Sequence, residues 1–392
     1  LYHFTGLLCQ VTDARTRPLI DTPAIYFSAA VMILARMGSL NALDQHRDNR
    51  FWGRWVGRAL PSADTIGRVF SQMDLDVIRS LLCSVYGRLK RNKALKRTHG
   101  FSVLIVDGHE SSSSYLRTCP GCLKRVIHSR DGQCIQYYHR NVVAMLSGRA
   151  FPLLLDVEEQ REGEDEVCAA FRLIRRVLKH YPRAFDVVVV DGLYLRADFF
   201  ALLLAHGKHV IAVLKDERRD LIQDVRGLFP LERPLVERRG NTQRRMWDIE
   251  GCRSWESLGR EVRVVRSVES RTVRRQRSGE TEQVTSEWMW AVTFSQKEAK
   301  TQAVVDLGHD RWLIENKAIN EMVTYWHADH VYRHHPIAIC AFWLTLMLVL
   351  NLFRAFLYLN IKPQLRHRHS NLYFARLISS GVYDETLLKI PP

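Results

Sequence analysis

The stretch FDVVVVDGLYLRADFF, residues 185–200, decides the fold class. Its four consecutive β-branched residues, 187–190, predict a short strand that is buried on both faces. Asp191 follows directly at the end of this run, and Gly192 comes next. Because an unpaired buried carboxylate costs several kcal/mol, Asp191 needs a partner. An Asp-Gly turn is the simplest explanation, and a bound cation is the functional one.

Strands and helices alternate on both sides of this run. Their βββαβαβ order predicts an α/β fold with a mixed five-stranded sheet, in which the last two strands are added by right-handed crossovers. The predicted elements, in chain order, are strands at 101–110, 136–146 and 151–158, a helix at 164–181, a strand at 185–190, a helix at 196–207 and a strand at 208–215.

The rest of the chain divides by its periodicity. The N-terminal part has helical apolar spacing at 22–37 and 74–95, and Ser62 or Asp64 can cap a helix between them. Residues 217–296 predict a β-rich insertion with Arg-rich turns. The expected domains are a helical N-terminal region (1–98), the first part of the core (99–216), the insertion (217–296), the second group of core helices (297–358) and a C-terminal tail (359–392).

The formal net charge of +15 is unevenly distributed. Residues 1–100 carry 15 Lys and Arg against 7 Asp and no Glu, and residues 217–277 carry 16 Arg, no Lys and 10 acidic residues. Such an excess is typical of proteins that bind nucleic acid or an anionic membrane, although many soluble proteins are moderately basic. The basic helices of the N-terminal region suit a DNA-binding module, and a helical lid over the main domain is the alternative.

One apolar segment, residues 337–350, tests the membrane alternative. It has 14 residues before Asn351 and Arg354 interrupt it, whereas a spanning helix needs about 20. We therefore expect a core helix and no membrane partner. No charged segment followed by an apolar one opens the chain, so we expect no secretory signal and a cytoplasmic protein with reduced cysteines.

Asp107 and Asp191 occupy corresponding positions, each at the end of a predicted strand and each followed by glycine. If these two strands are neighbours, the carboxylates lie side by side and repel unless a cation separates them. Hard divalent ions such as Mg²⁺ prefer oxygen ligands of this kind. Glu315, one helical turn after Arg311, is the best candidate for a third acid. Three such acids can hold two metal ions for phosphodiester chemistry.

With these features the chain resembles the DDE transposases of the IS4 type, which have a ribonuclease-H-like core. The resemblance spans roughly residues 60–355 and rests on the strand order, the two strand-end aspartates, the insertion and R-x-x-x-E at 311–315. The segment WHADHVYRHHPIA (326–338) is also similar to bacterial members of this group.

The resemblance implies an enzyme that binds the terminal inverted repeats of a mobile element, frees a 3′-hydroxyl at each end and transfers it to target DNA, as a homodimer on DNA. Asp107, Asp191 and Glu315 would be the catalytic acids and would hold two Mg²⁺ or Mn²⁺ ions. Glu321 and Asp329 compete with Glu315 for the third position, and an ordinary helix pair with Arg311 is the alternative for Glu315 itself.

The expected DNA contacts come from basic and aromatic side chains. Arg311 is the family arginine near the DNA phosphates, and phosphate neutralisation by basic residues predicts salt-dependent binding. Trp288 and Trp290 could stack on a flipped base, and core packing is their alternative. The candidate DNA-binding residues are Arg311, Lys317, Trp288, Trp290, Arg274 and Arg275.

The chain departs from the fuller family pattern, Y-x2-R-x3-E-x6-K, at two positions. Gly308 stands at the tyrosine position and Met322 at the lysine position, with His309 and Lys317 close by. A metal-dependent DNA nuclease on the same core and a catalytically inactive DNA-binding descendant are therefore the alternative functions. No phosphate-binding loop, dinucleotide fingerprint or H-E-x-x-H motif is present, which leaves ATP-driven and nicotinamide chemistry without a recognisable site.

A cysteine cluster lies between the first two predicted strands. Cys119 and Cys122 form C-x2-C, which is a zinc half-site, and Cys134 and His139 could supply the other two ligands. Reduced, unligated thiols are the alternative.

Overall fold

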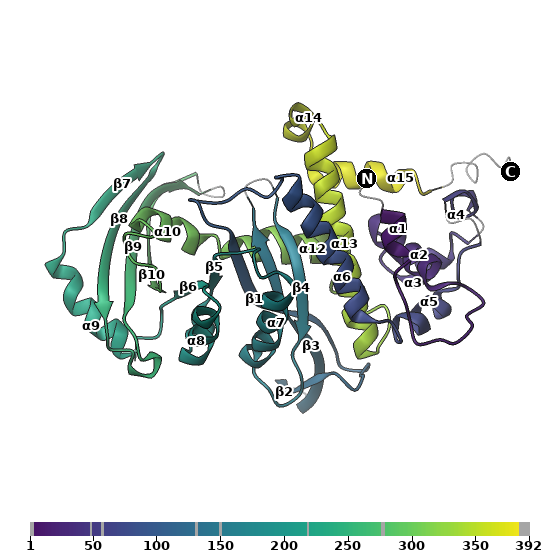
Figure 1. Cartoon of the computed structure of the whole chain (residues 1–392), viewed down its shortest axis with the longest axis horizontal. Coiled ribbons are helices and arrows are strands. Elements are labelled where there is room, and N and C mark those ends of the chain that lie inside the picture. Colours follow the sequence, from purple (N-terminus) through teal and green to yellow (C-terminus); the bar gives the residue numbers. More distant parts are fainter. Residues whose placement is uncertain are drawn as a thin grey trace.

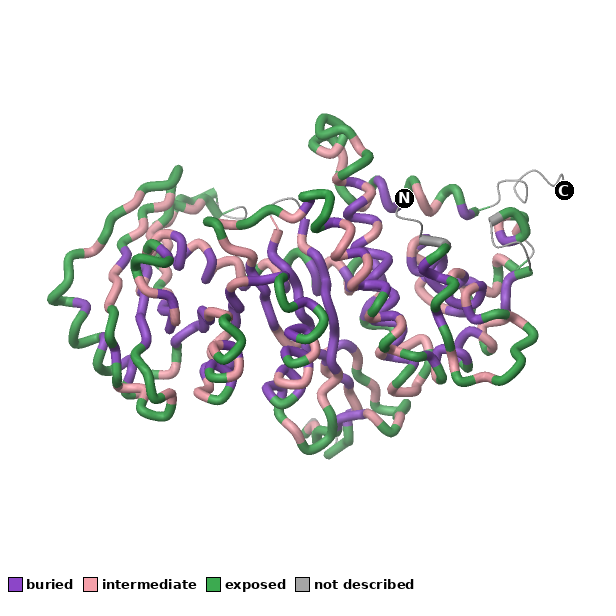
Figure 2. Tube along the Cα trace, in the orientation of Figure 1, coloured by how far each residue is buried: buried purple, intermediate pink, exposed green. Residues whose placement is uncertain are grey.

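The computed structural model describes residues 4–47, 49–55, 59–129, 132–148, 151–217, 219–275 and 279–383. The molecule is elongated, with a group of N-terminal helices at one end, a curved β-rich part at the other and the α/β core between them (Figure 1). Buried residues follow the central strands and the helices packed on them, whereas β7 and the outer loops are largely exposed (Figure 2).

The five predicted core strands are present in the predicted order. Across the sheet they run β4-β3-β1-β5-β6, with β3 antiparallel to both β4 and β1, and with β1, β5 and β6 parallel. The apolar run at 187–190 is fully buried, as expected for a strand covered on both faces. These strands are β1 (Val103–Ser114), β3 (Gly132–Ser147), β4 (Leu153–Glu159), β5 (Val187–Val190) and β6 (His209–Val213).

The prediction of a five-stranded sheet is wrong, because the sheet has ten strands. The insertion does not fold apart from the core: its last strand, β10, pairs antiparallel with β6 through Trp290, Ala291 and Val292. These residues are buried, so β10 covers what would otherwise be an exposed sheet edge. The additional strands are β2 (Leu123–Ser129), β7 (Leu235–Arg239), β8 (Thr242–Cys252), β9 (Val262–Arg274) and β10 (Thr281–Val292).

Helices pack on this sheet and begin at the caps that the sequence supplies. Asp165 accepts a hydrogen bond from the backbone N–H of Cys168 and caps α7, which packs on β3 and β4. The remaining helices of the core and insertion are α8 (Ala197–Ala205), α9 (Asp220–Leu228), α10 (Thr301–His309), α11 (Trp312–Ile314) and α12 (Asn320–Trp326), with α7 spanning Glu166–His180. Three short 3₁₀ turns lie at Gly192–Tyr194, Phe229–Leu231 and Glu256–Leu258.

The apolar helix α13 (Pro336–Asn360) is longer than predicted, with 25 residues. By length and composition it could cross a membrane, but 78% of its most apolar window is buried inside the protein, against α6, β4 and α2. Asn351 does not interrupt the helix, because its side-chain amide bonds both the N–H and the C=O of Leu154 in β4. Arg354 is likewise buried and pairs with Glu321 at 2.9 Å. Both polar groups are satisfied within the core, as burial requires.

The N-terminal region is helical, as predicted, and Ser62 caps α5 through the N–H of Thr65. Its longest helix, α6, packs against α13 and β4 and so joins this region to the core. The N-terminal helices are α1 (Phe4–Leu8), α2 (Thr22–Leu34), α3 (Leu40–Asp44), α4 (Arg50–Trp55), α5 (Ala63–Phe70) and α6 (Leu75–Arg91). The chain continues after α13 with α14 (Pro363–Arg368) and α15 (Asn371–Ser380).

Candidate active site

Asp191 directly follows β5, whereas Asp107 lies within the neighbouring strand β1, which pairs Asp107 with Val143 of β3 and continues to Ser114. The prediction that a strand ends at Asp107 is therefore wrong, and only the pairing of β1 with β5 ends near it, at Ile105. The parallel register of β1 and β5 pairs Val103 with Val187 and Ile105 with Val189. Two residues further along each strand, the same register brings Asp107 level with Asp191. The strand register therefore sets the two aspartates side by side, just beyond the last paired residues of β1 and β5.

Asp107 is the most perturbed carboxylate of this edge. Burial, together with the nearby carboxylates of Asp191, Glu166 and Glu315, raises its pKa to about 7 against the opposing effect of Arg311. Its Oδ2 accepts a hydrogen bond from Arg311 Nη1 at 3.1 Å. A half-neutral carboxyl group among other acids is one that a cation would stabilise in its charged form.

The carboxylate of Asp191 has two hydrogen-bond partners within the protein. Its Oδ1 accepts a hydrogen bond from the backbone N–H of Leu193 at 2.6 Å, which caps the short 3₁₀ turn that follows β5. Its Oδ2 lies 3.1 Å from Nζ of Lys215, at the end of β6. Asp191 thus both forms a turn and carries a charge at the end of β5, so the two explanations considered for it are compatible. Lys215 is a neighbour that the sequence analysis did not single out.

Glu315 lies on the helical segment that follows the insertion. Arg311 Nη1 donates to Glu315 Oε1 at 2.8 Å and to Asp107 Oδ2 at 3.1 Å. Because Asp107 Oδ2 and Glu315 Oε1 both contact Arg311 Nη1, the distance between these two oxygens is at most the sum of the two hydrogen-bond lengths. Glu315 therefore lies in the neighbourhood of Asp107. The helix changes to a π-helical turn over Glu315–Ile319, and such turns occur frequently at functional sites.

A fourth acid, Glu166, lies beside Asp107 at the start of α7, and the sequence analysis did not single it out. It is buried and accepts hydrogen bonds from Arg140 Nε at 2.7 Å and from the hydroxyl of Tyr194 at 2.6 Å. A Cβ placed on Gly108 would lie 2.0 Å from Glu166 Oε2, so a larger residue there would have to displace this carboxylate. Glu166 therefore supports the end of β1 and adds negative charge to the site.

The carboxylates fit a divalent cation by chemistry, but Arg311 lies between two of them. Among the described residues, Asp107, Asp191 and Glu315 do not form a group whose ligand atoms all lie within 4.8 Å of one another. Oxygen donors at adjacent strand ends are the ligands that Mg²⁺ and Mn²⁺ prefer. Joint binding of one cation by Asp107 and Glu315 therefore requires Arg311 to withdraw from Asp107.

The two departures from the family pattern have a structural explanation. A Cβ on Gly308 would lie 2.4 Å from Cε2 of Trp290, so the indole ring fills the space that a tyrosine side chain at this position would enter. Met322 is fully buried, where a lysine ammonium would be costly. His309, the residue after Gly308, forms a hydrogen bond between its Nε2 and Glu269 Oε1 at 2.7 Å.

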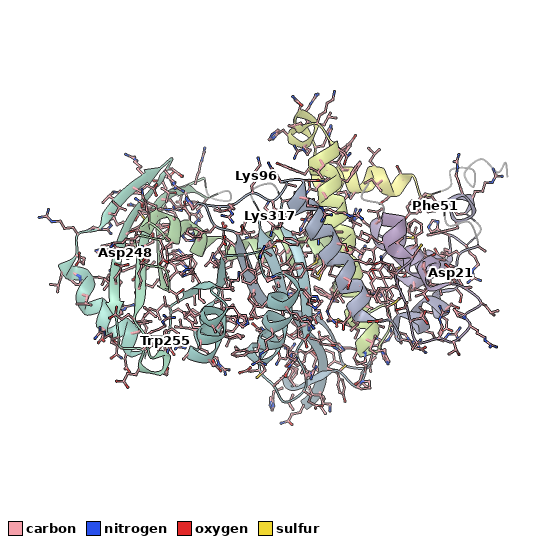
Figure 3. All side chains as sticks on the ribbon, in the orientation of Figure 1. Asp21, Phe51, Lys96, Asp248, Trp255 and Lys317 are labelled. Carbon is pink, nitrogen blue, oxygen red and sulfur yellow. The ribbon has the colours of Figure 1, made fainter. Side chains whose placement is uncertain are left out.

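The structure corrects one predicted DNA contact and leaves others at the surface. Trp290 is only 1% exposed and stacks with Trp288 in the core, so it is not available to DNA. Trp288 is half-buried and meets the exposed Trp312 edge to face. Lys317, labelled in Figure 3, is exposed. The arginines of the β9–β10 connection, Arg274 and Arg275, are also exposed.

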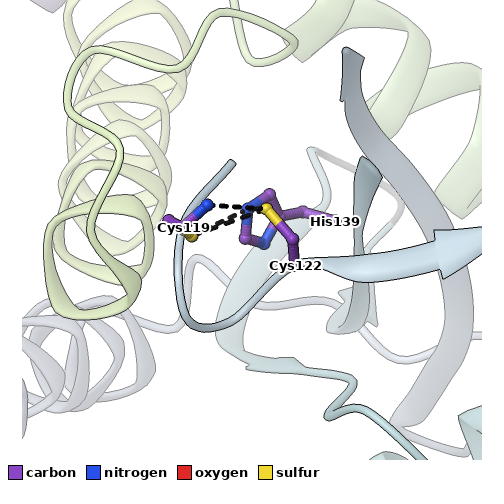
Figure 4. Close-up of side chains that lie close together, drawn as sticks. All are labelled: Cys119, Cys122 and His139. Atoms are coloured by element: carbon purple, nitrogen blue, oxygen red, sulfur yellow. Dashed lines mark hydrogen bonds between the residues drawn. The ribbon is translucent and has the colours of Figure 1, made fainter. Parts of the chain in front are cut away.

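Three of the four predicted zinc ligands come together, and one does not. Cys119, Cys122 and His139 form the only group of three or more potential metal ligands found in the part of the chain that the structure describes (Figure 4). Cys134 is exposed at the far end of the β2–β3 hairpin, where it faces Ile127. The prediction of Cys134 as a ligand is therefore wrong, because the hairpin carries it away from the C-x2-C turn.

His334 lies close to this cluster. Burial, followed by the charges of Arg117, His139 and His330, lowers the pKa of His334. A Cβ on Gly121, in the C-x2-C turn, would lie 3.0 Å from Pro336, which places the segment before α13 against the turn.

Acids gathered on adjacent strands of a mixed sheet are compatible with the class of metal-dependent enzymes that act on phosphodiesters. Residues 98–352 match the family described as Transposase DDE domain. The match covers more than half of the chain, and the chain belongs to this family of transposases. The family implies DNA as the substrate and divalent metal ions as cofactors. No curated protein matches the chain.

Proposed function

We propose that the protein is an IS4-type DNA transposase that cleaves the ends of an insertion element and transfers the 3′-hydroxyl to target DNA by two-metal-ion chemistry. Asp107, Asp191 and Glu315 are the proposed catalytic acids. The observation that carries the proposal is the pairing of β1 with β5, which sets the two aspartates side by side, together with the Arg311 bridge from Asp107 to Glu315.

The acids would hold Mg²⁺ or Mn²⁺ ions, which activate an attacking water or 3′-hydroxyl and stabilise the leaving oxygen when bound. The chain's own residues prepare this site. In the absence of metal ions, the positive charge of Arg311 offsets the negative charges of Asp107 and Glu315. When metal ions bind these acids instead, Arg311 would be available to contact DNA phosphates. Lys215 does the same for Asp191 at 3.1 Å.

Positive charge outside the site would position the DNA. Lys317 is exposed close behind Glu315 in the chain, and Arg274 and Arg275 are exposed at the end of the insertion. The basic N-terminal helices would bind the terminal inverted repeats. Because two element ends must be joined, the active form would be a homodimer on DNA, in the bacterial cytoplasm. These contacts predict binding that weakens steeply with salt.

The test is cleavage of a labelled element end in Mg²⁺ by the wild-type protein and by Glu315→Gln. We expect the substitution to abolish cleavage while DNA binding persists. The matched control is Asp329→Asn, a competing acid that is exposed in the loop after α12, and it should cleave like the wild type. Equal cleavage by wild type and Glu315→Gln would remove Glu315 from the mechanism.

Product analysis separates the alternatives. Joined products in a plasmid assay identify strand transfer, whereas cut but unjoined ends identify a nuclease on the same core. Repeats that are bound but remain intact in Mg²⁺ identify an inactive descendant. The departures at Gly308 and Met322 make this last comparison necessary, since both positions are built into the core.

A further inference from the structure

A separate group of metal-ligand side chains lies in the turn between β1 and β2. The sulfur atoms of Cys119 and Cys122 are 3.7 Å apart, and each lies 3.3 Å from Nε2 of His139. A disulfide is not formed, since that bond is about 2.05 Å long. Cys122 and His139 are buried, and Cys119 is half-buried.

The shape of this triangle is that of a tetrahedral zinc site. Zinc bonds of about 2.3 Å to sulfur and about 2.0 Å to nitrogen would set the two sulfurs about 3.8 Å apart and each sulfur about 3.5 Å from the nitrogen. The observed separations of 3.7 and 3.3 Å are within a few tenths of an ångström of these values. Little rearrangement is needed for one ion to contact all three atoms.

The surroundings of the triangle are those of a metal site. The second ring nitrogen of His139, Nδ1, bonds the carboxylate of Glu159, and a carboxylate on the far nitrogen commonly orients a zinc-bound histidine. The backbone N–H of Cys119 points at Cys122 Sγ at 3.1 Å, and the N–H of Cys122 bonds the C=O of Cys119. The turn is therefore already closed around the sulfurs.

A fourth ligand is available from the segment that leads into α13. Nδ1 of His334 is buried and has no hydrogen-bond partner within the described chain. His334 lies near His139, and Pro336 packs against Gly121 of the turn. The ligand atoms of His334 are not within 4.8 Å of all three atoms of the triangle, so this side chain would have to move toward them to bind the same ion.

We propose that Cys119, Cys122, His139 and His334 bind one structural Zn²⁺. The four protein ligands would close the coordination shell, so the ion has no open position for catalysis. It would fasten the β1–β2 turn, and the exposed β2–β3 hairpin beyond it, to the segment that joins α12 to α13. The site is independent of the carboxylates and of the proposed function.

The test is metal analysis of the purified full chain after reconstitution with Zn²⁺ and removal of loose metal. We expect one zinc per chain in the wild type and none in Cys119→Ser/Cys122→Ser. Cys134→Ser is the matched control from the same hairpin, and it should keep its zinc. Wild-type protein without bound zinc, or a double variant that keeps it, would overturn the proposal.

Two further variants test the ligand set without removing the thiols. Glu159→Gln should weaken zinc binding by roughly 10- to 100-fold in competition with a chelator, as loss of an orienting partner does. His334→Ala should weaken it at least as much, and unchanged affinity would remove His334 from the site. Co²⁺ substitution provides a readout of folded protein, because tetrahedral cobalt bound to thiolates has intense visible and near-ultraviolet absorption. Those bands must weaken when His334 is replaced.

Discussion

The carboxyl group of Asp107 makes the metal-free protein less stable as the pH rises. Its pKa is raised from 3.8 to about 7, first by burial and then by the neighbouring acids. At about 1.4 kcal/mol per unit, this rise corresponds to roughly 4 kcal/mol of folding free energy. Since the folded protein holds this proton more tightly than the unfolded chain, the stabilisation is complete below pH 4 and is lost as the pH rises to about 7.

Replacing Asp107 by Asn removes this titration. The measurement is urea denaturation followed by circular dichroism, in the presence of a metal chelator. Between pH 5 and pH 8, the free energy of unfolding of Asp107→Asn should rise by about 2–3 kcal/mol relative to that of the wild type. Mg²⁺ should stabilise the wild type at pH 8 and have a smaller effect on the variant, because binding of a cation offsets the charge repulsion.

The control for this experiment is Asp64→Asn, which alters a carboxylate whose side chain is 66% exposed. Its stability difference from wild type should be the same at both pH values. A pH-independent difference between Asp107→Asn and wild type would refute the reasoning, because it would show that Asp107 is charged in the folded protein throughout this range.

Three substitutions test other contacts of the core. Gly308→Tyr, which restores the family residue, should destabilise the protein by about 1–3 kcal/mol in urea denaturation, because Trp290 occupies that space. Gly108→Ala should cost a similar amount, because the new methyl group would displace the Glu166 carboxylate, and an unchanged urea midpoint would contradict this contact. Asn351→Leu should lower the thermal unfolding temperature, because two buried backbone groups of β4 lose their partner at about 1–3 kcal/mol each; a temperature equal to that of wild type would count against this role.

Local patterns in the sequence were sufficient for the core strands and for several helix starts. The run at 187–190 is a buried strand because four β-branched residues leave no polar face. Ser62 begins a helix because its hydroxyl satisfies a backbone N–H three residues later. The matched positions of Asp107 and Asp191 followed from the same reasoning, since both directly follow a short apolar run.

Contacts between distant segments could not be read in this way. The pairing of β10 with β6 joins residues about 80 positions apart, and no local pattern distinguishes a strand that extends the main sheet from one that forms its own. Alternation along the strand left both DNA contact and core packing open for Trp288 and Trp290, because it does not show which face of the strand is covered. The indole ring of Trp290 packs against Gly308, which has no side chain and lies on a helix further along the chain.

The amino-acid sequence by itself determined where the core strands lie and that Asp107 and Asp191 each follow a short apolar run, because these features depend on a few neighbouring residues. Only the tertiary structure decided that Arg311 lies between Asp107 and Glu315, that Glu166 reinforces the negative charge, and that His139 but not Cys134 lies beside the two thiols. The physical reason is that side-chain charge and ligand geometry act through space, over a few ångströms, between residues whose separation along the chain carries no information about their distance.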